Sequence, residues 1–198
     1  NDEIVNVEIP QRKGDPKLFS VDEGVRVEST YDSLSGLRPA FDKAGNITAG
    51  NASQIYDGGA AVIVASEAAA ERLGITPLGR IVGYGQVAGP DASLLDQPAN
   101  AINSALDRVG MKVSDLDLFE LNEAFAAVGV ASMAKLGITD EITNVNGGAI
   151  ALGHPIGMSG TRVALHLLLE LKRRGGGKGA AALCGGGGQG DAILLETI

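Results

Sequence analysis

Residues 116–137 read LDLFELNEAFAAVGVASMAKLG and contain one complete strand-to-helix unit. The apolar residues over 116–120 predict a short strand, and the helical pattern after it runs from about Glu123 to Leu136. Gly137 follows, at the position where helices commonly end in a left-handed residue. A strand that leads directly into a helix is the repeating unit of layered α/β proteins.

The same alternation continues on both sides of this unit. An apolar run at 60–65 predicts a strand covered on both faces, before a helix that Ser66 starts and Gly74 ends. We therefore expect an α/β layered fold that ends in a β-hairpin, with the irregular residues 1–50 outside its core. The remaining elements are strands over 80–84, 142–145, 180–183 and 192–195, and helices over 98–109 and 159–174, the last capped by Ser159.

The overall composition describes a folded chain without a membrane segment. Its 198 residues are 44% hydrophobic and 20% charged, and no apolar run approaches the ~18 residues that cross a bilayer. A net charge of -8 repels polyanions, so we expect no nucleic acid partner. The single cysteine, Cys184, suits a reducing compartment. The start without Met or a leader-like segment indicates processing or a fragment with no signal peptide, and we expect a cytoplasmic protein.

Three glycine-rich segments resemble nucleotide-binding loops in composition but lack the required context. Residues 83–88 match a dinucleotide fingerprint, yet Gly89-Pro90 follows where a helix should begin. Residues 175–179 lack the Ser or Thr that a phosphate-binding loop needs after its Lys, and residues 184–190 lie between two predicted strands. The four glycines after Cys184 instead let backbone N–H groups approach a ligand closely, with a thiol at the edge of that surface.

Polar residues gather in four segments, each of which also has a plain structural explanation. Asn122 could cap a helix, and His154 could be a hydrogen-bonded loop residue. Cys184 could be a buried inert thiol, and Ser53 could form a turn. Their joint occurrence favours a Cys–His site for thiol and proton-transfer chemistry on a polarised carbonyl, with backbone amides as an oxyanion hole. The segments are 50–53, 122–126, 144–157 and 184–190.

Two rival kinds of site find less support. One Cys and two His show no zinc-ligand spacing, so we expect no metal. The absence of a Gly-x-Ser-x-Gly elbow argues against a Ser-His-Asp hydrolase. His166, the second histidine, is expected to be an ordinary surface or packing residue.

Three of these segments together resemble the C-terminal signature blocks of the thiolases, which are acetyl-CoA acetyltransferases and 3-ketoacyl-CoA thiolases. The blocks are Asn122-Glu123-Ala124-Phe125, Gly153-His154-Pro155 after Asn146-Gly147-Gly148, and Cys184-Gly185-Gly186-Gly187. The resemblance implies a mixed sheet in α-β-α layers, built as a βαβαβαββ half-repeat. It divides the chain into the tail of a loop domain (1–55), the last elements of an N-terminal core domain (56–78) and a C-terminal core domain (79–198).

The resemblance also implies a role for each candidate site residue. His154 would activate a nucleophilic cysteine and share in oxyanion stabilisation, and Asn122 would orient a water in the first oxyanion hole. Cys184 would move the proton at the substrate α-carbon, which implies neighbours that bring its pKa from ~8.5 toward neutrality. Gly186 would donate its N–H to a second oxyanion hole. The implied coenzyme A contacts are Ser53, Arg26, Phe41 and Phe125.

The implied activity is reversible Claisen condensation and CoA-dependent thiolysis of 3-ketoacyl-CoA. Thiolases carry the acyl group on a cysteine in their N-terminal half, whereas Cys184 is the only cysteine here. We therefore expect a C-terminal half that is inactive alone and whose partners are the N-terminal half, acyl-CoA and CoA, in a homodimer or homotetramer. No permanently bound cofactor and no membrane are expected.

Departures from the family pattern leave the substrate open. Gln54 and Tyr56 stand where smaller or different residues are usual, and residues 94–98 (LLDQP) replace a Met-Gly-Thr-Gly-Pro loop. A 3-ketoacyl-CoA with an acyl chain longer or bulkier than that of acetoacetyl-CoA is therefore an alternative substrate. The alternative function is a non-catalytic CoA-binding or assembly domain. A decarboxylating condensing enzyme ranks lower, because Asn122 stands where those enzymes need a second histidine.

Overall fold

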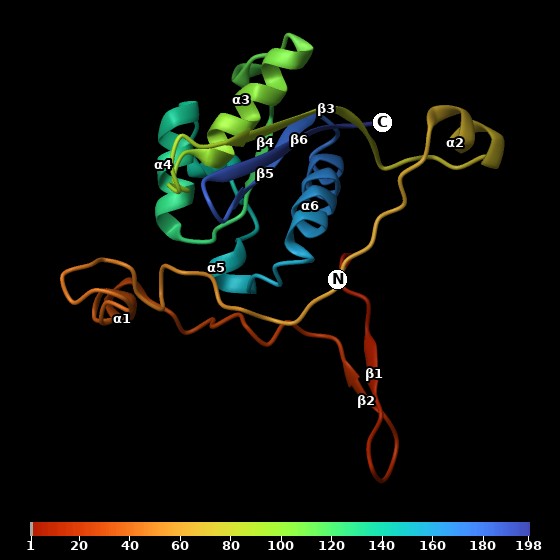
Figure 1. Ribbon diagram of the computed structural model, residues 1–198. Coiled ribbons are helices and arrows are strands. Elements are labelled where there is room, and N and C mark those ends of the chain that lie inside the picture. The colour runs from red at the N-terminus through yellow and green to blue at the C-terminus, as the bar shows by residue number, and fades with distance from the viewer. Residues whose placement is uncertain (1) are drawn as a thin grey trace.

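The computed structural model describes residues 2–198 and centres on a four-stranded mixed sheet (Figure 1). The strands lie in the order β3-β6-β5-β4, where β4 and β5 are parallel and the other two pairs are antiparallel. The mixed sheet and the terminal hairpin of β5 and β6 confirm the fold expected from the sequence. The strands are β3 (Gly79–Ala88), β4 (Leu118–Leu121), β5 (Lys178–Gly185) and β6 (Gln189–Thr197).

Helices cover both faces of this sheet. Helices α3 (Gln97–Val109) and α4 (Ala126–Leu136) pack on one face, and α6 (Ser159–Arg173) packs on the other (Figure 1). Because side chains alternate along a strand, Phe119 enters the core under α3, whereas its neighbour Leu118 packs against α6. This arrangement is the α-β-α layering that the resemblance implies.

Helix ends follow local sequence signals. Gly110 and Gly137 end α3 and α4 in the left-handed conformation, each with φ 69°. Helix α6 differs from the expectation, because Met158 is its N-cap residue and the Ser159 side chain caps nothing. Among residues 2–198 no helix is both long and apolar enough to cross a membrane. Shorter turns of helix are η1 (Val113–Asp115), η2 (Asp140–Ile142) and α5 (Ala149–Leu152).

The strand predicted over 142–145 is wrong in extent. Only Thr143 forms a parallel bridge, to Phe119. The next residue, Asn144, has a φ of 48° and turns the chain away. Its side chain then replaces the missing ladder, because Oδ1 accepts from Leu121 N–H and Nδ2 donates to Leu121 C=O, each at 2.8 Å. A side chain therefore extends the sheet beside the end of β4.

Residues 2–66 run outside the sheet domain, as expected for the first fifty (Figure 1). They contain the short antiparallel pair β1 (Val7–Ile9) and β2 (Lys17–Phe19) and the helix α1 (Tyr31–Ser35). The strand predicted at 60–65 is wrong for this chain, because no described strand flanks that run and Ile63 is 94% exposed. The helix after it, α2 (Glu67–Leu73), forms as predicted between Ser66 and Gly74.

Candidate active site

Two of the candidate residues lie at one edge of the sheet. Asn122 follows β4, is 1% exposed, and donates its N–H to Ala182 C=O of β5 at 2.9 Å. Cys184 lies two residues further along β5 and is half-buried. Since β4 and β5 are parallel, their carboxyl ends reach the same edge. The topology therefore brings Asn122 and the Cys184 segment together.

His154 reaches the same place from the loop after α5. Its Nε2 lies 3.4 Å from Asn122 Nδ2. Its backbone N–H donates to Gln54 C=O at 2.7 Å. The preceding Gly153 has a φ of 88°, which an L-residue rarely adopts, and the Tyr56 ring packs where a Cβ would stand. The His154 imidazole therefore reaches Asn122 because the backbone at residue 153 adopts a conformation that only glycine fits.

Ser159 fixes the other side of the imidazole. Its hydroxyl is fully buried, lies 2.6 Å from His154 Nδ1, and donates to Pro155 C=O at 3.1 Å. With its one hydrogen directed to Pro155, Ser159 Oγ accepts from His154 Nδ1–H, which assigns the lone pair to Nε2. Burial, and then the charge of Arg162, lower the pKa of His154 below its ordinary value of 6.5, so the ring is neutral near pH 7. Sequence analysis missed this role of Ser159.

A carboxylate links the Asn122 and His154 segments. Glu123 accepts from Asn144 Nδ2 at 2.8 Å and from the backbone N–H of Ile150 at 3.1 Å. A Cβ at Gly148 would lie within 2.5 Å of the Glu123 carboxyl group, so glycine alone leaves room for it. Glu123 belongs to the first signature block, which assigns it no role, and its place beside Asn122 is the signal for it in the sequence.

The candidate oxyanion donor Gly186 lies in the exposed turn between β5 and β6. Gly187 and Gly188 hold the turn with φ of 83° and 76°. At the start of the turn, burial raises the pKa of Cys184, and a backbone hydrogen bond offsets part of that effect. The expected lowering of this pKa by neighbouring groups is not found among the described residues, so the thiol form is favoured.

Residues 51–58 form a strap that crosses the Asn122 segment and the His154 segment. Ser53 lies on this strap. Its N–H and its hydroxyl both donate to Ala124 C=O, at 3.1 and 3.2 Å, and Ala52 forms a bridge with the half-buried Phe125. Further along the strap, Tyr56 Oη donates to the Gln54 side chain at 2.8 Å, beside the His154 contact described above. The strap therefore ties Ser53 and Phe125 to the same region as Asn122 and His154.

Arg26 and Phe41 are not brought to this edge of the sheet. Both are exposed in the segment that precedes the strap, residues 2–50, here called the N-terminal arm, and Phe41 is 79% exposed. No hydrogen bond or ion pair of residues 2–198 joins either side chain to the other candidates.

His166 is not a surface residue. It is 8% exposed, and its Nδ1 lies 2.8 Å from a Glu3 carboxylate oxygen, which ties the start of the chain to α6. Its Nε2 lies 3.2 Å from Asn146 Nδ2 and 3.7 Å from the buried Glu120. Burial is the largest cause that raises the pKa of Glu120, to about 8, and Arg162 partly opposes it. The other charged groups that raise this pKa are Glu123, Glu3 and Glu170.

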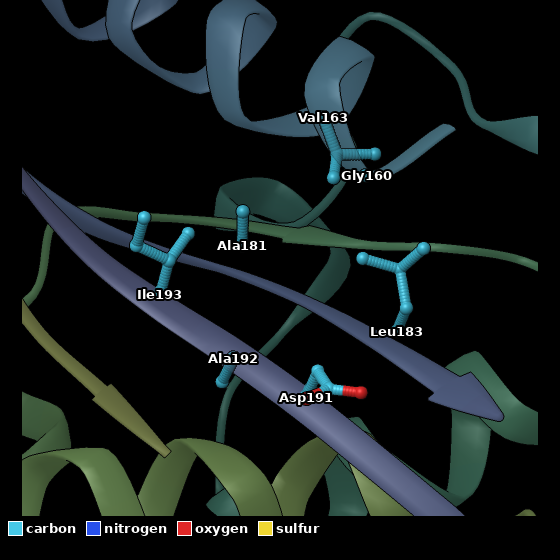
Figure 2. Close-up of a pocket in the computed structure, with 7 residues that line it drawn as sticks. All are labelled: Gly160, Val163, Ala181, Leu183, Asp191, Ala192 and Ile193. Carbon is cyan, nitrogen blue, oxygen red and sulfur yellow. The ribbon is translucent and has the colours of Figure 1, made fainter. Parts of the chain in front are cut away.

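A shallow cavity of about 150 Å³ lies on the α6 face of the sheet (Figure 2). Figure 2 shows Val163 and Gly160 of α6 on one side and side chains of β5 and β6 on the other. The cavity is apolar apart from Asp191 and contains none of the candidate site residues. The described residues also hold no cluster of three His, Cys, Asp or Glu side chains that could bind a metal ion.

Comparison of the sequence with known protein families shows to which family the chain belongs. The thiolase C-terminal domain matches residues 75–197, and the thiolase N-terminal domain matches residues 1–68. The chain belongs to the thiolase family. Among its relatives, a probable acetyl-CoA acetyltransferase of Mycobacterium tuberculosis is 60% identical over 196 residues, and the acetyl-CoA acetyltransferase of Cupriavidus necator is 53% identical over 197. This thiolase chain spans about half the length of these relatives, 50% of each, while the matches cover 99% of the chain itself.

Solved structures show the same fold. The acetyl-CoA acetyltransferase of Bacillus anthracis superposes with a TM-score of 0.95 at 45% identity, over 100% of this thiolase chain and 50% of that structure. Human mitochondrial 3-ketoacyl-CoA thiolase in complex with CoA superposes with a TM-score of 0.88 at 47% identity, over 92% of this chain and 46% of that one. The α/β architecture of the described residues is therefore that of a thiolase.

Proposed function

We propose that this chain is the C-terminal half of an acyl-CoA C-acyltransferase that condenses acyl-CoA and cleaves 3-ketoacyl-CoA with CoA. The observation that carries the proposal is the 3.4 Å approach of His154 Nε2 to Asn122 Nδ2, beside the parallel strand that bears Cys184. Relatives with 60% and 53% identity are described as acetyl-CoA acetyltransferases, and a structure with the same fold holds CoA.

His154 acts as the base for the nucleophilic cysteine of the N-terminal half. Its neutral ring, with the lone pair on Nε2, accepts the thiol proton while Nδ1–H keeps its bond to Ser159. The thiolate attacks the thioester carbonyl, and CoA leaves as its thiol after it regains that proton. The protonated Nε2–H is then a donor for an oxyanion, and the ring does not need to turn.

Cys184 moves the proton at the α-carbon. In thiolysis the nucleophilic cysteine adds to the 3-keto carbon, the C–C bond breaks, and the enolate of acetyl-CoA takes its proton from the Cys184 thiol. The Cys184 thiolate regains a proton from the incoming CoA thiol, whose sulfur takes the acyl group, and the released cysteine thiolate recovers its proton from His154. The raised pKa of Cys184 favours the thiol that this step consumes. The enolate charge on the thioester oxygen is met by His154 and by a water on Asn122, whose buried Oδ1 no described residue engages. Gly186 N–H serves the second oxyanion hole.

Coenzyme A would lie along the strap and the N-terminal arm. Ser53 and Phe125 are held beside the site, and Arg26 and Phe41 are exposed on the arm, where a ligand can reach them. CoA enters as a substrate, and no permanently bound cofactor takes part.

The domain division follows from the same proposal. Residues 79–198 form the C-terminal core domain, residues 56–78 the last elements of the N-terminal core domain, and residues 1–55 the tail of the loop domain. The exposed apolar run at 60–65 supports this division, because it has a strand-like sequence and no strand beside it among the described residues. The remaining partners are the N-terminal half and further copies of the enzyme, as a homodimer or homotetramer.

The test is an assay of acetoacetyl-CoA and longer 3-ketoacyl-CoA thiolysis by the full-length enzyme and by the 198-residue chain alone. The full-length enzyme should turn over and the isolated chain should not, because its only cysteine is Cys184. A full-length protein that binds CoA but cleaves none of these substrates would instead support a non-catalytic CoA-binding domain.

A further inference from the structure

The turn that contains Gly186 must lose an unusually large amount of backbone conformational entropy when it becomes ordered. Residues 185–188 are four consecutive glycines between β5 and β6. Glycine gives up more backbone entropy on ordering than any other residue. An oxyanion donor works only when it is fixed before the reaction, so a turn of this composition needs an anchor outside itself.

The side chain of Gln97, the first residue of α3, contacts this turn. It is 4% exposed, and its Nε2 donates to the carbonyls of Gly188 and, at 2.9 Å, Gly89. Its Oε1 accepts from Asn100 Nδ2 at 2.8 Å. A flipped amide would direct Oε1 at two carbonyl oxygens, so the hydrogen bonds define one orientation. All the polar atoms of the buried amide are therefore used.

Close backbone packing places the turn on the same support. Gly89 N–H donates to the carbonyl of Gly188 at 2.9 Å, so this oxygen accepts two hydrogen bonds. A Cβ at Gly190 would lie 2.4 Å from Gln97 C=O, and one at Gly188 would overlap Asp91 C=O. The base of the turn thus rests on the start of α3, and Gln97 is the side chain that joins them.

Gln97 lies in the segment 94–98 (LLDQP), and its side chain is the one that reaches the carbonyls at the base of the turn. We propose that Gln97 is a positioning residue that holds the Gly185–Gly188 turn in the shape required for the oxyanion donor at Gly186. The inference rests on the proposed function only for the role of Gly186, since the contacts themselves are structural.

The test compares two Gln97 variants of the full-length enzyme. Gln97→Met removes both donors at similar size, and kcat should fall about 10- to 100-fold at every pH, with KM for CoA changed less than about twofold. Gln97→Glu keeps the shape but directs carboxylate oxygens at two carbonyls. Relative to wild type at the same pH, its kcat should be low at pH 8 and recover in part as the pH is lowered and the buried carboxyl group is protonated. The recovery is partial because the protonated group donates one hydrogen bond where the amide donates two.

Gln86→Met is the matched control. Gln86 is an exposed glutamine on β3 whose Nε2 donates to Asp191 at 2.7 Å, away from the turn, and its substitution should leave kcat within about twofold. Equal losses in both Met variants, or a Gln97→Glu rate that does not recover at low pH, would overturn the inference.

Amide hydrogen exchange tests the anchor without any activity. In Gln97→Met, and not in Gln86→Met, exchange should accelerate in peptides that cover 184–190 and 87–92, because the Gly89 N–H bond to Gly188 depends on the same anchor. Unchanged exchange would refute the anchor even if activity fell. A wild-type enzyme without thiolysis activity would refute the proposed function, while the exchange result would still decide whether Gln97 holds the turn.

Discussion

Ser159 Oγ and His154 Nδ1 lie 2.6 Å apart at the start of α6, where the serine is fully buried and the histidine half-buried. The contact leaves His154 Nε2 as the atom that faces Asn122. A serine in this position supports the neutral ring and the protonated ring equally, because Oγ accepts from Nδ1–H in both.

Ser159→Ala should therefore lower kcat of the full-length enzyme by about 10- to 100-fold while KM for CoA changes little. The substitution removes the acceptor that sets the tautomer, and steady-state thiolysis measures the effect. Ser132→Ala is the control, since Ser132 is equally buried but its hydroxyl donates to Leu95 C=O at 3.0 Å, away from His154. If both variants lost activity alike, the role of Ser159 would be structural.

Asn122→Ala and Cys184→Ser should each reduce thiolysis by full-length enzyme about 10²- to 10⁴-fold. Asn122→Ala removes the amide beside His154 Nε2, and Cys184→Ser replaces the thiol proposed to carry the proton with a hydroxyl of much higher pKa. Circular dichroism of each variant should match that of the wild type. Near-normal rates would remove these two residues from the proposed chemistry.

Gly148→Ala should destabilise the protein by about 1–3 kcal/mol, measured by chemical denaturation. The added methyl group would displace the Glu123 carboxylate, which would lose its bonds to Asn144 and Ile150. Gly129→Ala in α4 is the contrasting variant, because a Cβ there meets no atom within 4 Å. It should raise stability by about 0.5–1 kcal/mol, the usual gain from replacing glycine inside a helix. The reverse order of the two stabilities would contradict the packing described at Gly148.

Glu120 should give the stability of the protein a characteristic pH dependence. Its pKa of about 8 in the folded state lies above the value of 4.5 for the free side chain, so between these values the folded state binds the extra proton. Stability should therefore fall as pH rises from 4.5 to 8, by at most about 1.4 kcal/mol per pH unit from this group. Glu120→Gln, which keeps the shape without the charge, should flatten that decline. A denaturation series at pH 5, 6, 7 and 8 on both proteins measures it, and parallel curves would contradict the assignment.

Much of the fold was predictable because its signals are local. The left-handed glycines Gly74, Gly110 and Gly137 end helices where the sequence indicates, and the apolar strands near the chain end form the predicted hairpin. The prediction fails where a side chain competes with the backbone. Asn144 pairs with Leu121 instead of continuing a strand, and no periodicity encodes that choice.

The candidate site was predictable only at the level of its motifs. Asn122 and His154 meet because a strand end and a loop after α5 converge, as the signature blocks imply. The residues that support them escaped notice, because their roles depend on contacts between distant segments. Ser159 has the appearance of a helix cap in the sequence, and Gln97 that of a departure from the family pattern. Their roles emerge only from the fold, which places Ser159 against the His154 ring and Gln97 against two carbonyls.

The exposed apolar segment at 60–65 also makes this chain susceptible to cleavage by proteases. A protease needs extended, accessible backbone, and these residues supply it, with Ile63 and Val64 at 94% and 73% exposed. A cut there would leave the strap hydrogen-bonded at Ala124 and His154. Residues 2–58 could then remain bound to the sheet domain as a separate peptide, so that a nicked molecule would keep its shape and reveal the break only once denatured.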